Sequence, residues 1–317
     1  PAATATVTIN QTPSAPAAGS NSPVCDGNNL SLTASAAGAT YSWTGPNSFT
    51  STDQNPVITG AAAAAGVYSV TATSVEGCTG SAGTTSVTIT PLPLAPVAGS
   101  NSTVCSGDIL SLTAGAIGGA TYSWTGPDGF TSTAQNPTVA SVSTDAAGTY
   151  SVTATVSGCP GPAGTTAVAI NQTPDAPIAG SNTPVCSGQD LSLTASTVGG
   201  STYSWTGPNS FTSTEQNPII TGISTLGSGA YSVTATENGC TGSAGTTSVT
   251  INQTPVAPAA SSNSPLCEGN TLSLTASSTG ATYSWNGPNS YTSTSQNPAL
   301  SSVTSAESGT YSVTATS

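Results

Sequence analysis

The sequence contains no lysine, arginine or histidine, whereas twelve aspartates and glutamates give it a formal net charge of -12. Nucleic-acid binding is excluded on this ground, because proteins hold phosphate backbones mainly with lysine and arginine. Anionic membrane surfaces are disfavoured for the same reason. No salt bridge between side chains can form, so stability must come from apolar burial, hydrogen bonds and covalent links.

Methionine and long hydrophobic runs are also absent. No apolar run approaches the ~20 residues that a membrane-spanning helix needs, and no signal peptide is recognisable. We therefore expect no membrane insertion. Because the chain starts at Pro1, we also expect it to be a processed product or a window of a longer protein.

Catalytic side chains are scarce as well. Nucleophilic catalysis by serine or threonine lacks a histidine or lysine base, and the carboxylates change between repeats, since Asp53 aligns with Ala134, Glu215 and Ser295. Acid–base chemistry needs two carboxylates in a set geometry. We predict that the chain is not an enzyme and has no cofactor. Calcium at an Asp-rich joint is the alternative, although no Asp-x-Asp-x-Asp loop occurs.

What the sequence does contain is an internal repeat. Tyr-Ser-Trp recurs with its tryptophan at Trp43, Trp124, Trp205 and Trp285, every 80 or 81 residues. Such self-similarity marks a tandem array, and proline-spaced joints such as Leu92-Pro93-Leu94-Ala95-Pro96 separate the copies. The predicted modules are module 1 (13–92), module 2 (93–173), module 3 (174–254) and module 4 (255–317), preceded at 1–12 by the closing strand of another module.

Each module has the pattern of a β-sandwich. In module 2, residues 110–114 alternate apolar and polar side chains, as do 120–124 and 148–155, and this period of two indicates half-buried strands. Turn residues such as Gly126-Pro127-Asp128-Gly129 separate these runs. About seven short strands in roughly eighty residues are typical of an immunoglobulin-like sandwich. We predict an all-β chain of tandem antiparallel sandwiches arranged as a linear rod.

Two strands of module 2 resemble the immunoglobulin superfamily. Residues 107–114 (Gly-Asp-Ile-Leu-Ser-Leu-Thr-Ala) are similar to its strand B, and 145–152 (Asp-Ala-Ala-Gly-Thr-Tyr-Ser-Val) to its strand F, with Ala114 and Val152 where the family has its two cysteines. The shifted cysteines, Tyr-Ser-Trp-Thr-Gly-Pro and Gln-Asn-Pro further resemble the Ig-like and PKD-like repeats of large secreted surface proteins of Bacteroidota. These include gliding-motility adhesins exported by the type IX system.

Seven cysteines without histidine or a Cys-x-x-Cys pair are read as disulfide partners in an oxidising compartment. We expect pairing within modules, which joins Cys25 to Cys78, Cys105 to Cys159 and Cys186 to Cys240, with Cys267 unpaired because the chain stops. The alternative is a link between modules, such as Cys25 to Cys159. This alternative stays open because the start of strand B and the end of strand F lie ~20 Å apart in an ordinary sandwich, which is too far for one disulfide.

Three of the recurring aromatic positions in each module are candidate site residues. We expect the four tryptophans to be core, together with one tyrosine per module that makes a tyrosine corner: Tyr68, Tyr150, Tyr231 and Tyr311. A third position follows the hairpin turn, where packing is expected and a sugar-binding face is the alternative: Phe49, Phe130, Phe211 and Tyr291.

The two ends of the chain complement each other. Residues 5–10 (Ala-Thr-Val-Thr-Ile-Asn) match the closing strand at 247–252, whereas module 4 ends before such a strand. An arbitrary window of a longer array explains this, and the alternative is strand donation, in which Val7 and Ile9 of one copy complete module 4 of another.

Taken together, these features predict an extracellular, cell-surface structural or adhesive protein that forms a fibre or filament stalk. Its partners would be copies of itself or further repeats, joined head to tail. The alternatives are a carbohydrate-binding array that recognises surface glycans and an inert spacer in a larger secreted protein.

Overall fold

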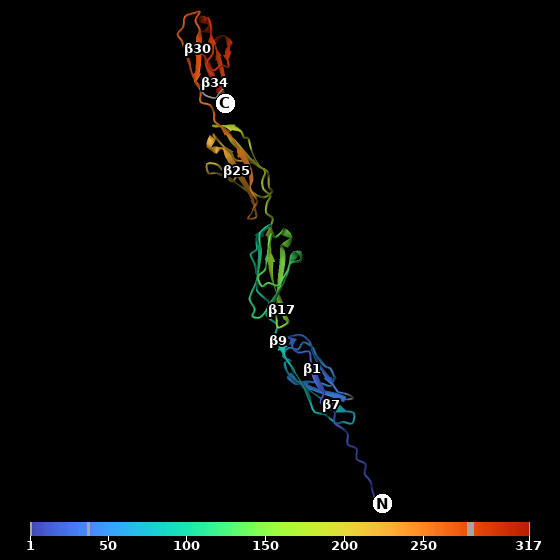
Figure 1. Ribbon diagram of the computed structural model, residues 1–317. Coiled ribbons are helices and arrows are strands. Elements are labelled where there is room, and N and C mark those ends of the chain that lie inside the picture. Colours follow the sequence, from blue (N-terminus) through green and yellow to red (C-terminus); the bar gives the residue numbers. More distant parts are fainter. Residues whose placement is uncertain (1, 37–38, 278–281, 317) are drawn as a thin grey trace. The chain divides into compact units, whose positions relative to one another are not determined.

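The computed structural model describes residues 2–36, 39–277 and 282–316 and is all-β, with only short 3-10 helices between strands. The chain divides into two compact units, Pro1–Gln172 and Thr173–Ser317. Four separate buried clusters lie one in each of the repeats defined above. Figure 1 shows the strands gathered into separate sandwiches, with β7 in the first and β30 and β34 in the last.

The first unit holds modules 1 and 2. The strands of module 1 are β1 (Ala17–Ser20), β2 (Val24–Cys25), β3 (Leu30–Ser35), β4 (Ala39–Gly45), β5 (Phe49–Ser51), β6 (Val57–Ile58), β7 (Gly66–Ser74), β8 (Gly83–Val87) and β9 (Ile89–Thr90), with the 3-10 helix η1 (Pro46–Ser48). Those of module 2 are β10 (Ala98–Ser100), β11 (Val104–Cys105), β12 (Leu110–Ala114), β13 (Thr121–Thr125), β14 (Thr131–Ser132), β15 (Thr138–Val139), β16 (Gly148–Val156), β17 (Cys159–Val168) and β18 (Ile170–Asn171), with η2 (Pro127–Gly129) and η3 (Thr144–Ala146).

The second unit holds modules 3 and 4. The strands of module 3 are β19 (Ala179–Ser181), β20 (Val185–Cys186), β21 (Leu191–Ala195), β22 (Thr202–Gly207), β23 (Phe211–Ser213), β24 (Ile219–Ile220), β25 (Gly229–Glu237), β26 (Cys240–Thr241), β27 (Gly245–Val249) and β28 (Ile251–Asn252), with η4 (Thr225–Gly227). Those of module 4 are β29 (Ala259–Ser262), β30 (Leu272–Ser277), β31 (Thr282–Gly287), β32 (Tyr291–Ser293), β33 (Ala299–Leu300) and β34 (Ser312–Thr316), with η5 (Pro288–Ser290) and η6 (Ser305–Glu307).

Modules 1 to 3 share one sheet topology. In module 1, a three-stranded sheet β1-β3-β6 faces a four-stranded sheet β5-β4-β7-β8, and all of these pairs are antiparallel. The chain then continues from β8 into β9, which pairs parallel with β2. This tandem β-sandwich architecture is the predicted fold class. The closing strand, β8 with β9, therefore pairs first with β7 of the four-stranded sheet and then with β2.

Alternation of side chains explains the sandwich core. Along β7 the side chains of Tyr68, Val70 and Ala72 are buried, and the residues between them are not. Along β3 the side chains of Leu30 and Leu32 are buried in the same way. Since successive side chains of a strand point to opposite faces, each strand contributes one apolar face to the core. The polar serines and threonines of the same strands face outwards.

The repeated Gln-Asn-Pro motif ties strand β12 to the core tryptophan of module 2. The Gln135 side-chain amide donates to the carbonyl of Ala114 (2.8 Å), and the Asn136 side-chain oxygen accepts from the Ala114 N–H (3.0 Å). The indole of Trp124 donates to the carbonyl of Gln135 (3.2 Å). Ala114 stands where the immunoglobulin family has a cysteine, so hydrogen bonds hold this position here. In the sequence the motif contributed only to a family resemblance, and these hydrogen bonds were not predicted from it.

The proline joints lie against glycines of the closing strand. A Cβ atom at Gly164 would overlap the carbonyl oxygen of Pro96, and one at Gly161 would overlap that of Pro93. Modules 1 and 3 repeat this close approach at Gly83 and Gly245. The recurring Gly-x-x-Gly in the final hairpin is therefore a packing requirement, because only glycine lets the two backbones approach so closely.

We predict that Gly164→Ala destabilises module 2 by about 1–3 kcal/mol, because the new methyl group must displace the backbone of the joint. Hydrogen exchange measured by mass spectrometry after pepsin digestion should show faster exchange in β12 and β16, with module 3 of the same chain as the internal reference. Gly118→Ala is the matched control, because nothing lies within 4 Å of its Cβ. Equal exchange in the two variants would contradict this account of the joint.

Candidate functional site

A disulfide joins modules 1 and 2 within the first unit. Cys25 is bonded to Cys159, with their Cα atoms 5.5 Å apart and a sequence separation of 134. Cys25 ends β2, where it lies opposite Thr90, the last residue of the closing strand of module 1. Cys159 begins β17, the closing strand of module 2. The disulfide thus bridges the far end of one sandwich and the near end of the next.

The expected pairing within modules is wrong, and the strand geometry gives the reason. Cys105 lies opposite Asn171 at the end of β18, whereas Cys159 lies at the start of β17. About 12 residues of extended chain separate these two ends, or about 40 Å at ~3.3 Å per residue. Disulfide-bonded cysteines need Cα atoms within about 7 Å. The two cysteines of one module therefore cannot reach each other.

The other expected pairs fail as well. Cys78 and Cys186 are free thiols, so neither the Cys25–Cys78 nor the Cys186–Cys240 bond exists. Cys267 is free, and Cys105 and Cys240 are each disulfide-bonded. The signal in the sequence was the distance between the start of strand B and the end of strand F, which had kept the Cys25–Cys159 link open as the alternative.

The tryptophans and corner tyrosines lie in the cores. All four tryptophans are at most 1% exposed. Tyr68, Tyr150 and Tyr231 are buried, and each phenol donates to the carbonyl four residues before it, as Tyr150 does to Ala146 (2.9 Å). Burial raises the pKa of these three phenols above 10.0, with a further contribution from Asp128 at Tyr150. Tyr311 makes the same bond to Glu307 (3.0 Å) but is only half-buried.

The aromatic residues after the hairpin turn pack edge to face against those tyrosines. Phe130 meets Tyr150 edge to face, with the ring centroids 5.4 Å apart, and Phe49, Phe211 and Tyr291 make the equivalent pairs at 5.6 Å. All four side chains are half-buried and pack against their module's core. These contacts give each ring a structural role.

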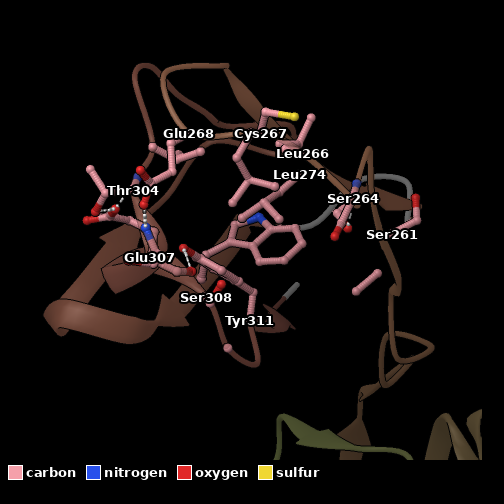
Figure 2. Close-up of a pocket in the computed structure, with 17 residues that line it drawn as sticks. Ser261, Ser264, Leu266, Cys267, Glu268, Leu274, Thr304, Glu307, Ser308 and Tyr311 are labelled. Atoms are coloured by element: carbon pink, nitrogen blue, oxygen red, sulfur yellow. Dashed lines mark hydrogen bonds between the residues drawn. The ribbon is translucent and has the colours of Figure 1, made fainter.

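Module 4 has an open groove on one side of its sandwich. The cavity has a volume of about 440 Å³, and its lining includes Leu266, Leu274, Trp285, Val303 and Tyr311. Among the described residues no strand pairs with the outer edge of β34, and Leu266 and Cys267 form no strand. In modules 1 to 3 the closing strand occupies this place. Figure 2 shows Leu266 and Leu274 on one side of the groove, and Thr304 and Glu307 on the other.

Glu307 lies on the polar side of the groove and makes three hydrogen bonds there. Its carboxylate accepts hydrogen bonds from the Thr304 N–H (2.8 Å), the Thr304 hydroxyl (2.7 Å) and the Asn289 side-chain amide (3.1 Å). The bond from the backbone of Thr304, followed by the one from its hydroxyl, lowers the pKa of Glu307 below 4.5. The carboxylate completes the capping box of η6 together with the Thr304 side chain.

The proposed donor strand lies outside any sheet. Residues 2–16 contain no strand, and the side chains of Val7 and Ile9 are 79% and 91% exposed. The equivalents of Val7, which are Val87, Val168 and Val249, are at most 5% exposed in the closing strands of modules 1 to 3, and two equivalents of Ile9, Ile170 and Ile251, are 9% and 6% exposed. The segment therefore has the sequence of a buried strand and the exposure of a free one.

Other classes of site have little support in the structure. Within residues 2–36, 39–277 and 282–316, no three cysteine, aspartate or glutamate side chains come together as potential metal ligands. The same residues contain no helix long and apolar enough to cross a membrane. Two candidate sites remain: the disulfide-bonded junction of modules 1 and 2, and the groove of module 4.

No protein-family model and no curated protein matches this chain. Among solved structures it is similar to Sidekick-1 immunoglobulin domains 1–5, at 14% identity over 97% of this chain and 77% of that one, with a TM-score of 0.29. It is also similar to the ectodomain of mouse nectin-like molecule 4, at 12% identity over 73% and 96% of the two chains, with a TM-score of 0.31. Likeness at this level carries no information about function.

We predict that the carboxyl group of Glu307 titrates below 4.5 in a ¹³C NMR titration, because its hydrogen bonds favour the charged form. Since the folded pKa lies below the unfolded one, the stabilisation is present above pH 4.5 and is lost as the pH falls through the folded value. Thr304→Val, which removes the hydroxyl donor, should raise the midpoint towards 4.5. A wild-type midpoint at or above 4.5 would contradict the assigned hydrogen bonds.

Proposed function

We propose that this chain is an extracellular structural and adhesive protein whose tandem modules form a surface fibre or a filament stalk. The observation that carries the proposal is the disulfide between Cys25 and Cys159, which links consecutive modules. A linker alone would leave each module free to unfold under tension. The disulfide closes a loop around most of modules 1 and 2, so that force applied at the ends bypasses 134 residues.

Chemical composition supports the same role. Disulfides persist in oxidising, extracellular compartments, and a chain without lysine or arginine offers no cleavage site to trypsin-like proteases. Its conspicuous aromatic side chains pack within the modules, and its capping carboxylate Glu307 is engaged in hydrogen bonds. The partners that fit such a chain are further modules of the same kind, joined to it head to tail.

We predict that reduction lengthens the fully stretched chain. In a Cys105→Ser/Cys240→Ser background, which removes the other two disulfide-bonded cysteines, force spectroscopy should record about 450 Å of additional contour length after reduction, at ~3.4 Å for each of 134 residues. Adding Cys25→Ser should give the longer extension without reductant. A gain of about 180 Å, the value for pairing within module 1, would contradict the proposal, as would no gain at all.

A glycan array separates this role from the carbohydrate-binding alternative. Because Phe49 and Phe130 stack on buried tyrosines, the structural role predicts no sugar bound with a sub-millimolar dissociation constant. It also predicts that Phe130→Ala acts through the stability of module 2. A sub-millimolar sugar whose binding is lost in Phe130→Ala, with folding unchanged, would favour the carbohydrate-binding alternative.

A further inference from the structure

We propose that the joint between modules 1 and 2 is a redox-controlled hinge, in which the disulfide between Cys25 and Cys159 stops the modules from turning about their linker and its reduction releases them. The inference rests on the proposed structural role and names how the stiffness of that stalk is regulated. It is carried by the places at which the linker and the disulfide leave module 1 and enter module 2.

The chain leaves module 1 at a fixed point. Thr90 ends β9, the last strand of module 1, and pairs with Cys25 of β2. The carbonyl of Thr90 also accepts a hydrogen bond from the Asp26 N–H (2.9 Å). The disulfide leaves module 1 from the same pair of residues, since Cys25 is one of its two cysteines. The linker and the disulfide therefore start side by side.

Both connections also reach module 2 at one place. The disulfide ends at Cys159, the first residue of β17. The linker ends at Pro93, whose carbonyl oxygen lies so close to Gly161 of the same strand that a Cβ atom there would overlap it. Gly161 follows Cys159 by two residues in the sequence. The linker between the two held parts is therefore Pro91 and Leu92.

Two connections in parallel restrict motion more than one does. Proline fixes its own φ, but the ψ angle of Pro91 and both backbone angles of Leu92 can still change, so a single linker lets the modules turn. With the disulfide closed, the same rotation would stretch a covalent bond. Among the described residues the buried clusters of modules 1 and 2 are separate, so no shared core adds a further constraint. The disulfide therefore sets the stiffness of this joint.

A thiol can reach the disulfide from the side of Cys25, which is half-buried, whereas Cys159 is only 3% exposed. A small-molecule thiolate attacks the Cys25 sulfur, forms a mixed disulfide there and releases the Cys159 thiolate. A second thiolate attacks the small-molecule sulfur of that mixed disulfide and releases the Cys25 thiolate. The protein disulfide is reduced and two small thiols are oxidised to one disulfide. The two cysteines take up the two protons that the small thiols lose.

Reduction changes the joint and leaves the sandwich cores as they are. Neither Cys25 nor Cys159 belongs to the buried cluster of its module as the structure describes it, so both cores keep their contacts when the bond opens. The linker alone then joins the modules, and Pro91 and Leu92 let them turn. The hinge therefore has two states that differ in the freedom between the modules.

The test measures residual dipolar couplings of the ¹⁵N-labelled chain in a Cys105→Ser/Cys240→Ser background, which removes the other two disulfide-bonded cysteines. In the oxidised protein we expect one alignment tensor to fit modules 1 and 2, because they move as one body. Adding Cys25→Ser/Cys159→Ser should abolish the shared tensor, while the amide chemical shifts of β3 and β12 stay unchanged. Dithiothreitol added to the background protein should cause the same loss, and its removal in air should reverse it.

Two further variants separate the effect of the disulfide from that of the linker. Cys186→Ser, at a free and exposed cysteine, should leave the shared tensor intact. Pro91→Ala should also leave it intact in the oxidised protein, and should increase the difference between the two modules only after reduction.

The proposal is wrong if one tensor still fits both modules in Cys25→Ser/Cys159→Ser, or if the oxidised protein already needs two tensors. It is also wrong if Pro91→Ala alone separates the tensors, or if dithiothreitol opens the bond only when a module unfolds. The extension test measures the length that the disulfide closes off and not the stiffness of the joint, so the stalk role can survive each of these outcomes.

Discussion

Two cysteines of one module cannot meet, because the closing strand holds them at opposite ends of the sandwich. Cys105 lies beside the end of that strand and Cys159 at its start. Cys159 instead bonds to Cys25 of the preceding module, so the disulfide lies at the junction of modules 1 and 2. In the loop-entropy description, closing a loop of 134 residues stabilises the folded state by about 5 kcal/mol. Modules 1 and 2 share this stabilisation.

The absence of cationic side chains makes such links more important. With no salt bridges between side chains available, each sandwich depends on one tryptophan-centred core and on hydrogen bonds between uncharged groups. The bonds that Gln135 and Asn136 make to Ala114 are an example, because they hold the position at which immunoglobulin domains have a cysteine. The covalent bond between Cys25 and Cys159 lies at the junction of two modules.

Much of the fold could be predicted from the sequence. Alternation in residues such as Leu110–Ala114 identified strands, and the repeat of Tyr-Ser-Trp identified the modules and their cores, because both features are local. The disulfide pairing was not decided by the sequence, which left Cys25–Cys159 as the alternative to pairing within modules, since the choice depends on where a strand of about ten residues places its two ends. The groove of module 4 was foreseen only as a missing strand. Its depth and its lining by Glu307 and Trp285 needed the packed structure.

The most direct test of this account is a disulfide map of the oxidised protein, made without reduction and with chymotrypsin and Asp-N because trypsin has no site. The account predicts a peptide containing Cys25 joined to one containing Cys159, with Cys78 recovered as a free or alkylated thiol. A Cys25–Cys78 peptide pair would contradict it, because the bond would then lie within a module and the junction would not be covalent.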